Sequence, residues 1–182
     1  MTGRAEPTHH PAAKALHWIT ALLVIGLLGV GLWMTDLPLG FTKLYAYAWH
    51  KWIGLVVLAL TAVRLSWRRR HPPPPLPDSV APWQAALARM AHWALLGLLV
   101  AMPVSGWLMS SAAGVSVTWF GYLRLPDLVP REQDLFETLR TTHHVLARCL
   151  ISLLVVHVAA VVHHDVVRRH GVFRRMWPFG GS

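Results

Sequence analysis

Four long apolar stretches, separated by short polar segments, dominate the hydropathy pattern of this chain. The stretches cover about residues 15–35, 47–67, 91–112 and 145–162. A transmembrane helix needs about 20 predominantly apolar residues to cross the hydrocarbon core of a bilayer, and each stretch reaches or approaches that length. The pattern therefore predicts an all-α fold, an integral membrane four-helix bundle that forms a single domain. We expect its helices at about residues 14–35, 44–67, 84–111 and 134–169.

The connections between these stretches carry residues that end helices. Pro38 and Gly40 lie in a short loop after the first helix, and four consecutive prolines, Pro72 to Pro75, follow the second. Proline fixes φ and lacks a backbone donor, so such a run favours a stiff, extended spacer. We expect the longest connection, residues 113–137, to carry a short amphipathic stretch that caps the bundle.

Composition and charge agree with a membrane protein. Of the 182 residues, 54% are hydrophobic and 14% are charged, whereas about 25% of a soluble domain is charged. If the connections alternate between two sides, eleven of the 17 Lys and Arg residues fall on the side that holds both termini. The positive-inside rule then predicts that both termini are cytoplasmic. Topology and lipid headgroup contacts account for the net charge of +9, so we expect no nucleic-acid partner.

The most informative polar residues are two histidines in the fourth stretch, His143 and His157. They lie fourteen residues apart, which is nearly four helical turns, so both imidazoles share one face about 21 Å apart along the axis. His17 lies near the inner end of the first helix and His50 near the outer end of the second. Ionisable side chains at membrane depth are costly and usually belong to a site inside the bundle.

Depth pairs His50 with His143 near the outer side of the membrane. By the same reasoning His17 pairs with His157 nearer the inner side. Neutral imidazole is the usual nitrogen ligand of haem iron, and two imidazoles fill both axial positions. The simplest chemistry for this pattern is two bis-histidine b haems stacked across the membrane and carrying electrons. The single cysteine, Cys149, belongs to no Cys-x-x-Cys-His sequence, which excludes a covalently attached c-type haem.

His144 competes with His143 for the outer position. Its spacing of thirteen residues from His157 puts these two side chains on nearly opposite faces, so the sequence favours His143. The alternative for the whole set is an ordinary group of interfacial histidines at helix ends, the role expected of His71 and His163.

Other side chains are expected to contact the cofactors. Gly54 lies one turn from His50 and would let a flat macrocycle approach the backbone, although close helix packing explains this glycine equally well. Arg64 lies at the depth of the inner pair, where it either binds a haem propionate or snorkels to the membrane surface. Lys51 and Arg148 surround the outer pair and would bind propionates or attract a small anion.

The order of these residues resembles the bacterial cytochrome b561 family. The resemblance rests on His17-Trp18, on the segment His50-Lys51-Trp52-Ile53-Gly54, on Arg64 and on the paired histidines of the fourth helix. It covers nearly the whole chain. It implies a four-helix protein of the bacterial inner membrane, with two b haems that exchange electrons with quinone.

For a stand-alone member, the resemblance implies superoxide:ubiquinone oxidoreductase activity, with superoxide or another small reductant oxidised on the periplasmic side. The alternative is a cytochrome b membrane anchor that passes electrons between quinone and a partner dehydrogenase or hydrogenase, as in related b subunits. A haem or metal transporter using the same histidines is a third possibility. His92 and Trp93, at the inner end of the third helix, are candidates for the ubiquinone contact, although an interfacial role suits His92 as well.

Overall fold

The computed structural model describes residues 9–74, 80–168 and 171–177, and four long helices account for most of them. These helices are α1 (Pro11–Asp36), α2 (Phe41–Arg70), α3 (Pro82–Ala112) and α4 (Gln133–Val162). Each is long and apolar enough to cross a membrane, which confirms the predicted all-α membrane bundle. The cytoplasmic placement of the termini stays a prediction.

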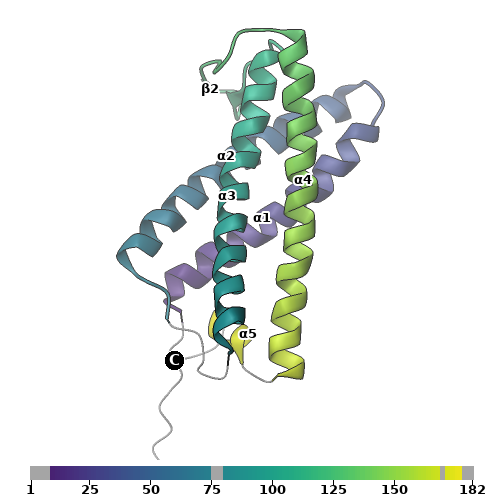
Figure 1. Cartoon of the computed structure of the whole chain (residues 1–182). Coiled ribbons are helices and arrows are strands. Elements are labelled where there is room, and N and C mark those ends of the chain that lie inside the picture. The colour runs from purple at the N-terminus through teal and green to yellow at the C-terminus, as the bar shows by residue number, and fades with distance from the viewer. Residues whose placement is uncertain (1–8, 75–79, 169–170, 178–182) are drawn as a thin grey trace, which may run out of the picture.

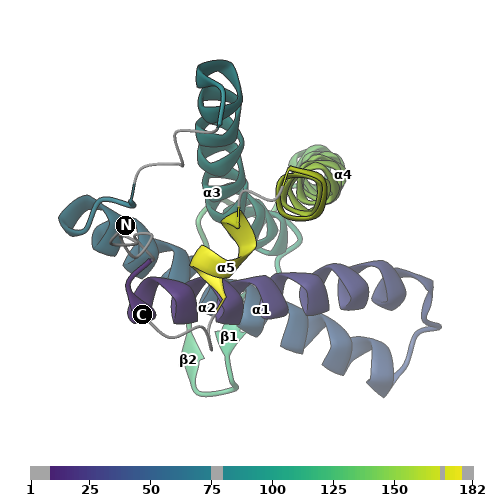
Figure 2. The same ribbon diagram turned by 90° about the horizontal axis from the view of Figure 1, so that it is seen from below.

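The bundle is made of two helical hairpins that cross at an angle. Consecutive helices pack against each other: α1 against α2, α3 against α4, and α2 against α3. Figures 1 and 2 show the first hairpin running obliquely across the second. At the crossing, each helix contributes one buried apolar side chain to a common core, namely Val24, Val57, Leu99 and Leu150.

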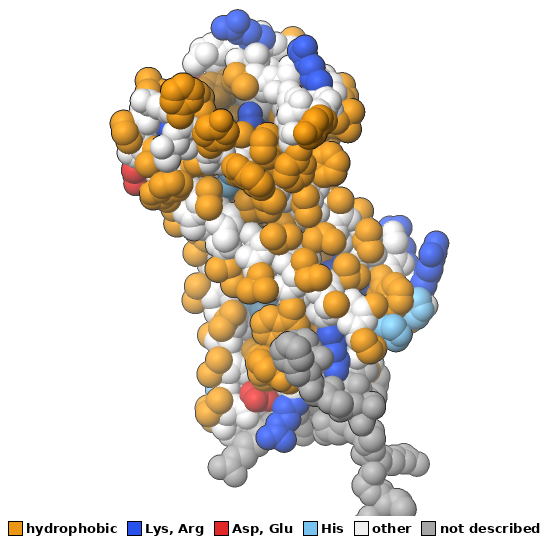
Figure 3. All heavy atoms as spheres, turned by 180° about the vertical axis from the view of Figure 1, so that it is seen from behind, with side chains coloured by type: hydrophobic (Ala, Val, Ile, Leu, Met, Phe, Trp, Pro, Cys, Tyr) orange, Lys and Arg blue, Asp and Glu red, His pale blue; other side chains and the backbone are white. Residues whose placement is uncertain are grey.

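Few of the large apolar side chains are buried, and those that remain exposed cover the outside of the helices. Figure 3 shows them across the middle of one face, with Lys and Arg side chains toward the ends. This is the surface expected where lipid is the solvent. The buried hydroxyls are satisfied locally, because Thr20 donates to Leu16 O at 2.6 Å and Thr61 donates to Val57 O at 2.7 Å.

The first three helices begin two or three residues before their predicted starts, and α4 begins one residue before its predicted start. Pro11 and Pro82 occupy the first turns of α1 and α3, where proline costs no hydrogen bond. The last helix differs more, because α-helical geometry ends at Val162 and a π-helical turn, η1 (His163–Val167), continues it. The predicted end at residue 169 lies outside the described residues.

The connection between α3 and α4 holds a β-hairpin where the sequence predicted an amphipathic stretch. Strands β1 (Thr118–Trp119) and β2 (Leu123–Arg124) pair antiparallel. The turn contains Gly121, whose φ of +80° suits glycine. The hairpin is attached to α2, because Trp52 Nε1 donates to Thr118 O at 2.6 Å. We call this end of the bundle the outer end and the opposite one the inner end.

A short helix, α5 (Val172–Met176), covers the inner end of α1. Trp18 Nε1 donates to Met176 O at 2.8 Å, and the backbone N–H of Phe173 donates to Asp165 Oδ1 at 3.2 Å. Edge-to-face packing of the Trp18 and Phe173 rings completes the contact. The segment after the fourth span is therefore folded back onto the start of the first.

Candidate functional site

At the outer end, the structure brings together the imidazoles of His50 from α2 and His143 from α4. Their ring centroids are 6.5 Å apart and their planes are inclined by 74°. Two metal–imidazole bonds of about 2 Å each would separate the facing nitrogens by about 4 Å, and the rings add the rest. The pair therefore has the spacing of two ligands on opposite sides of one metal ion.

A hydrogen bond determines which nitrogen of His143 is available. Ser105 Oγ lies 2.8 Å from His143 Nδ1 and 2.8 Å from Met102 O. The hydroxyl hydrogen goes to the carbonyl oxygen, which can only accept, so Oγ accepts a hydrogen bond from Nδ1–H. A neutral imidazole with hydrogen on Nδ1 has its lone pair on Nε2, the nitrogen that can bind a metal. His144 is exposed on α4.

Each outer imidazole lies against a glycine of the neighbouring helix. A Cβ added at Gly31 of α1 would lie 3.1 Å from His50 Cε1, and one added at Gly106 of α3 would lie 3.3 Å from His143 Cε1. A side chain at either position would require the ring to shift by a few tenths of an ångström. Gly54, in contrast, has no atom within 4 Å of an added Cβ, so it borders open space beside His50.

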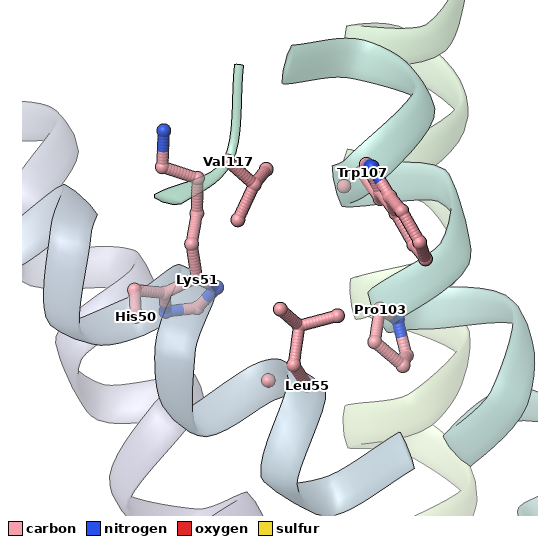
Figure 4. Close-up of a pocket in the computed structure, with 8 residues that line it drawn as sticks. His50, Lys51, Leu55, Pro103, Trp107 and Val117 are labelled. Atoms are coloured by element: carbon pink, nitrogen blue, oxygen red, sulfur yellow. The ribbon is translucent and has the colours of Figure 1, made fainter. Parts of the chain in front are cut away.

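That open space consists of two adjoining cavities. The first has a volume of about 40 Å³ and lies between α2, α3 and the segment before the hairpin; its lining includes His50, Lys51, Leu55, Trp107 and Val117. Figure 4 shows His50 and Lys51 of α2 across the gap from Pro103 and Trp107 of α3. The second has a volume of about 60 Å³, and both outer histidines line it with Gly54 and the four core residues.

At the inner end, each long helix contributes one polar side chain to a second group. The group consists of His17 (α1), Arg64 (α2), His92 (α3) and His157 (α4). Arg64 Nη2 donates to His17 Nδ1 at 3.2 Å, and the rings of His92 and His157 have centroids 5.5 Å apart. His17 lies within electrostatic range of His157 and His92.

The other predicted contact residues are placed less uniformly. Lys51 is half-buried and lines the first outer cavity beside His50. Arg148 is exposed on α4. Arg64 donates to the imidazole of His17. The sequence offered His92 as a candidate ubiquinone contact or an interfacial residue, and the structure puts its ring beside that of His157.

Sequence reasoning missed the roles of Ser105, Gly106 and Gly31. Small residues are common in transmembrane helices because they let backbones approach, so their presence alone did not point to the histidines. The usable signal was the adjacent Ser105-Gly106 pair, at a depth comparable to that of His143. It became informative only once α3 was known to pack against α4.

The residues present fit a haem better than a bare metal ion. Among the described residues, no group of three or more His, Cys, Asp or Glu side chains is placed to hold a metal. A metal bound only by protein normally needs three or four such ligands. Haem iron needs only two, because the macrocycle supplies the rest. His50 Nδ1 is buried with no hydrogen-bond partner, so protein contacts leave this imidazole uncommitted.

Comparison with known proteins agrees with this chemistry. The family model described as prokaryotic cytochrome b561 matches residues 8–179. Cytochrome b561 homolog 2 of Escherichia coli (strain K12) is 32% identical over an alignment of 172 residues that covers 90% of this chain and 88% of that protein. Probable superoxide oxidase CybB of Yersinia pestis is 30% identical over an alignment of 166 residues that covers 88% of this chain and 91% of that protein. The chain belongs to the prokaryotic cytochrome b561 family, whose members bind haem b and transfer electrons as multi-pass proteins of the bacterial inner membrane.

Proposed function

We propose that this protein takes electrons from superoxide at the outer, periplasmic side and passes them through two b haems to ubiquinone. The observation that carries this proposal is the placement of histidines at two depths of one membrane bundle, His50 beside His143 at the outer end and His17 with His157 in the inner group. The whole chain would then form one electron-transfer domain, with both termini in the cytoplasm. The printed name of the Yersinia pestis relative, probable superoxide oxidase, supports the choice of substrate.

In this proposal His50 and His143 hold the outer haem, and His17 and His157 hold the inner one. Iron with two imidazole ligands exchanges single electrons and offers no free position for oxygen. The assignment of His17 to the inner haem also involves Arg64. Arginine can only donate, so its bond to Nδ1 makes His17 an acceptor there and leaves the hydrogen of the neutral ring on Nε2. If Arg64 paired with a propionate instead, the ring hydrogen of His17 could move to Nδ1, and Nε2 would then carry the lone pair that binds a metal.

The donor side is expected at the outer cavity. The Lys51 side chain lies beside His50 at this cavity, as Figure 4 shows, and its positive charge would raise the local concentration of a small anion. Two superoxide anions each lose one electron there and leave as O₂. Quinone takes up those two electrons with two protons and leaves as quinol, so the charges and atoms balance.

The acceptor side is expected where the inner group reaches the lipid. His92 and Trp93 are both exposed on α3, and the His92 ring lies 5.5 Å from that of His157. The guanidinium of Arg68 lies over the Trp93 ring, 4.8 Å from its centroid. A quinone ring arriving from the membrane would find an aromatic surface and an imidazole that can hydrogen-bond its carbonyl oxygen.

The test is a visible spectrum of the detergent-purified protein while superoxide is generated enzymatically and ubiquinone is then added. We expect reduction of the α-band that superoxide dismutase abolishes and ubiquinone reverses. Lys51→Gln should slow reduction by superoxide, and the effect should shrink as salt screens the charge. Arg131→Gln, which removes one exposed positive charge elsewhere on the outer side, is the matched control.

Three outcomes would contradict the proposal in different ways. Absence of a haem spectrum removes its foundation. A haem that ignores superoxide but is reduced by quinol favours the anchor role beside a partner dehydrogenase. Equal slowing by Lys51→Gln and Arg131→Gln shows that general outer charge, rather than the cavity, attracts the anion.

A further inference from the structure

Ser105 occupies a position in α3 that links the backbone of its own helix to the outer histidine of α4. Its Oγ lies 2.8 Å from Met102 O and 2.8 Å from His143 Nδ1, and the residue is only 6% exposed. A buried hydroxyl has one hydrogen to give, and water does not compete for it. The carbonyl oxygen of Met102 must receive that hydrogen, because otherwise two oxygens would face each other without one.

We propose that Ser105 is the positioning residue of the outer site, which holds His143 with its hydrogen on Nδ1 and its Nε2 turned toward the iron. The proposal rests on the proposed role of His143 as a haem ligand. Second partners of this kind fix the tautomer and the ring orientation of a metal-bound histidine, and they make the bound nitrogen more basic. Ser105 itself touches neither the iron nor a substrate.

The next residue provides the space that this contact requires. A Cβ at position 106 would lie 3.3 Å from His143 Cε1 and 3.6 Å from Nδ1, so glycine lets the ring come close enough to reach the hydroxyl. Ser105 and Gly106 thus act on the same edge of the imidazole. The other outer histidine lacks an equivalent arrangement, because His50 Nδ1 is buried with no hydrogen-bond partner.

This asymmetry gives the proposal a specific consequence. An imidazole whose Nδ1–H is accepted by an oxygen donates more electron density to the iron and favours the oxidised state. Removal of the hydroxyl should therefore raise the midpoint potential of the outer haem and leave the inner haem unchanged. It should also weaken retention of the outer haem by about tenfold, the lower end of the range for such contacts.

The experiment is a redox titration of purified full-length Ser105→Ala, followed at the α-band, with electron paramagnetic resonance of the oxidised protein. The titration separates the two potentials, and the resonance spectrum reports the orientation of the axial rings. Ser105→Thr keeps a hydroxyl and should restore the parent values. Ser110→Ala removes another buried serine of α3, in the turn beyond the site, and is the matched control.

A higher potential and an altered spectrum for the outer haem alone, with parent values in Ser105→Thr and Ser110→Ala, supports the proposal. Unchanged values in Ser105→Ala, or equal shifts of both haems, would overturn it. Failure of the proposed function is recognised separately, because then the parent protein binds no haem or His143→Ala keeps both. If Ser105→Ala does not fold, Ser105→Cys replaces it; this variant must also shift only the outer potential, because a thiol is a weak acceptor.

Discussion

The outer pair and the inner group use the same residue type but are organised differently. At the outer end two imidazoles face each other, 6.5 Å between centroids, each against a glycine of a neighbouring helix. At the inner end three imidazoles and a guanidinium gather, and Arg64 already occupies Nδ1 of His17. The outer site thus presents two imidazoles already spaced for one metal ion. The inner site holds more polar side chains than the two imidazoles that one haem would need, so their contacts would have to change on binding.

This difference teaches how a membrane bundle accommodates polar side chains. Buried polar groups in hydrocarbon need partners, and the outer histidine of α4 finds one in Ser105 of the adjacent helix. At the inner end, Arg64 is the partner of His17, and the rings of His92 and His157 pack against each other. In the proposed assignment, the inner group would exchange partners on binding a haem, and His92 would stay available for quinone.

The largest expected effect comes from removing His143, the proposed outer ligand on α4. His143→Ala should lose the outer haem, which halves the haem-to-protein ratio, because His50 alone cannot fill both axial positions. His144→Ala, which alters an exposed neighbour, should keep the full ratio. The pyridine haemochrome assay with protein quantification measures both. Loss of haem from His144→Ala instead would show that α4 is rotated so that His144, rather than His143, faces the bundle.

The second comparison tests which inner imidazoles bind iron. His17→Ala should remove the inner haem and keep the outer one. His92→Ala should keep both haems but reduce quinone several-fold more slowly, because the variant would lose only one hydrogen bond to the quinone. Haem content and stopped-flow quinone reduction separate these cases. If His92→Ala loses the inner haem, then the ligand pair is His92 with His17 or His157, and the assignment from sequence is wrong.

A third test asks whether Gly31 and Gly106 are needed for the positions of the outer imidazoles. Gly31→Ala and Gly106→Ala should each weaken outer haem retention about tenfold, because the added methyl group displaces a ligand ring. Gly26→Ala, whose Cβ meets nothing within 4 Å, is the control and should leave both haems in place. Transfer of haem from each variant to apomyoglobin measures its rate of haem dissociation. Equal rates in all three variants would show that the outer rings adjust freely.

A smaller effect is expected from the β-hairpin that adjoins the outer cavity. Trp52→Phe removes the hydrogen bond to Thr118 O and should lower the free energy of unfolding by about 1 kcal/mol. If the hairpin also shields the outer haem, the reduced protein should be reoxidised faster by a membrane-impermeant oxidant. Trp119→Phe, on the same hairpin, is the control. Unchanged reoxidation would limit the hairpin to a structural role.

The smallest effect concerns the inner end. Burial, followed by the nearby positive charge of Arg175, holds the pKa of His9 below its usual 6.5. The folded protein therefore prefers neutral His9, and its stability should fall as the pH drops below 6.5 toward the lowered pKa, because the unfolded chain takes up the proton first. His9→Gln should flatten this part of the pH profile of thermal unfolding. An unchanged profile would assign the slope to other groups.

Much of the fold could be predicted from the sequence because transmembrane helices are recognised by the length and the low polarity of single segments. The fourteen-residue spacing of His143 and His157 predicted one shared face, and depth alone paired His50 with His143. The β-hairpin was missed because two-residue strands have too few residues to show an alternating pattern. The π-helical turn after Val162 was missed because its sequence continues the helical pattern unchanged.

The sequence by itself determined the four spans, their order and the depth of each histidine, since hydrophobic length and helical rise are properties of a single segment. Only the tertiary structure decided which groups touch each imidazole: Ser105 and Gly106 at His143, Gly31 at His50 and Arg64 at His17. Those contacts depend on how each helix is rotated about its axis and how the two hairpins cross. In lipid these are set by packing between helices, which no single helix encodes.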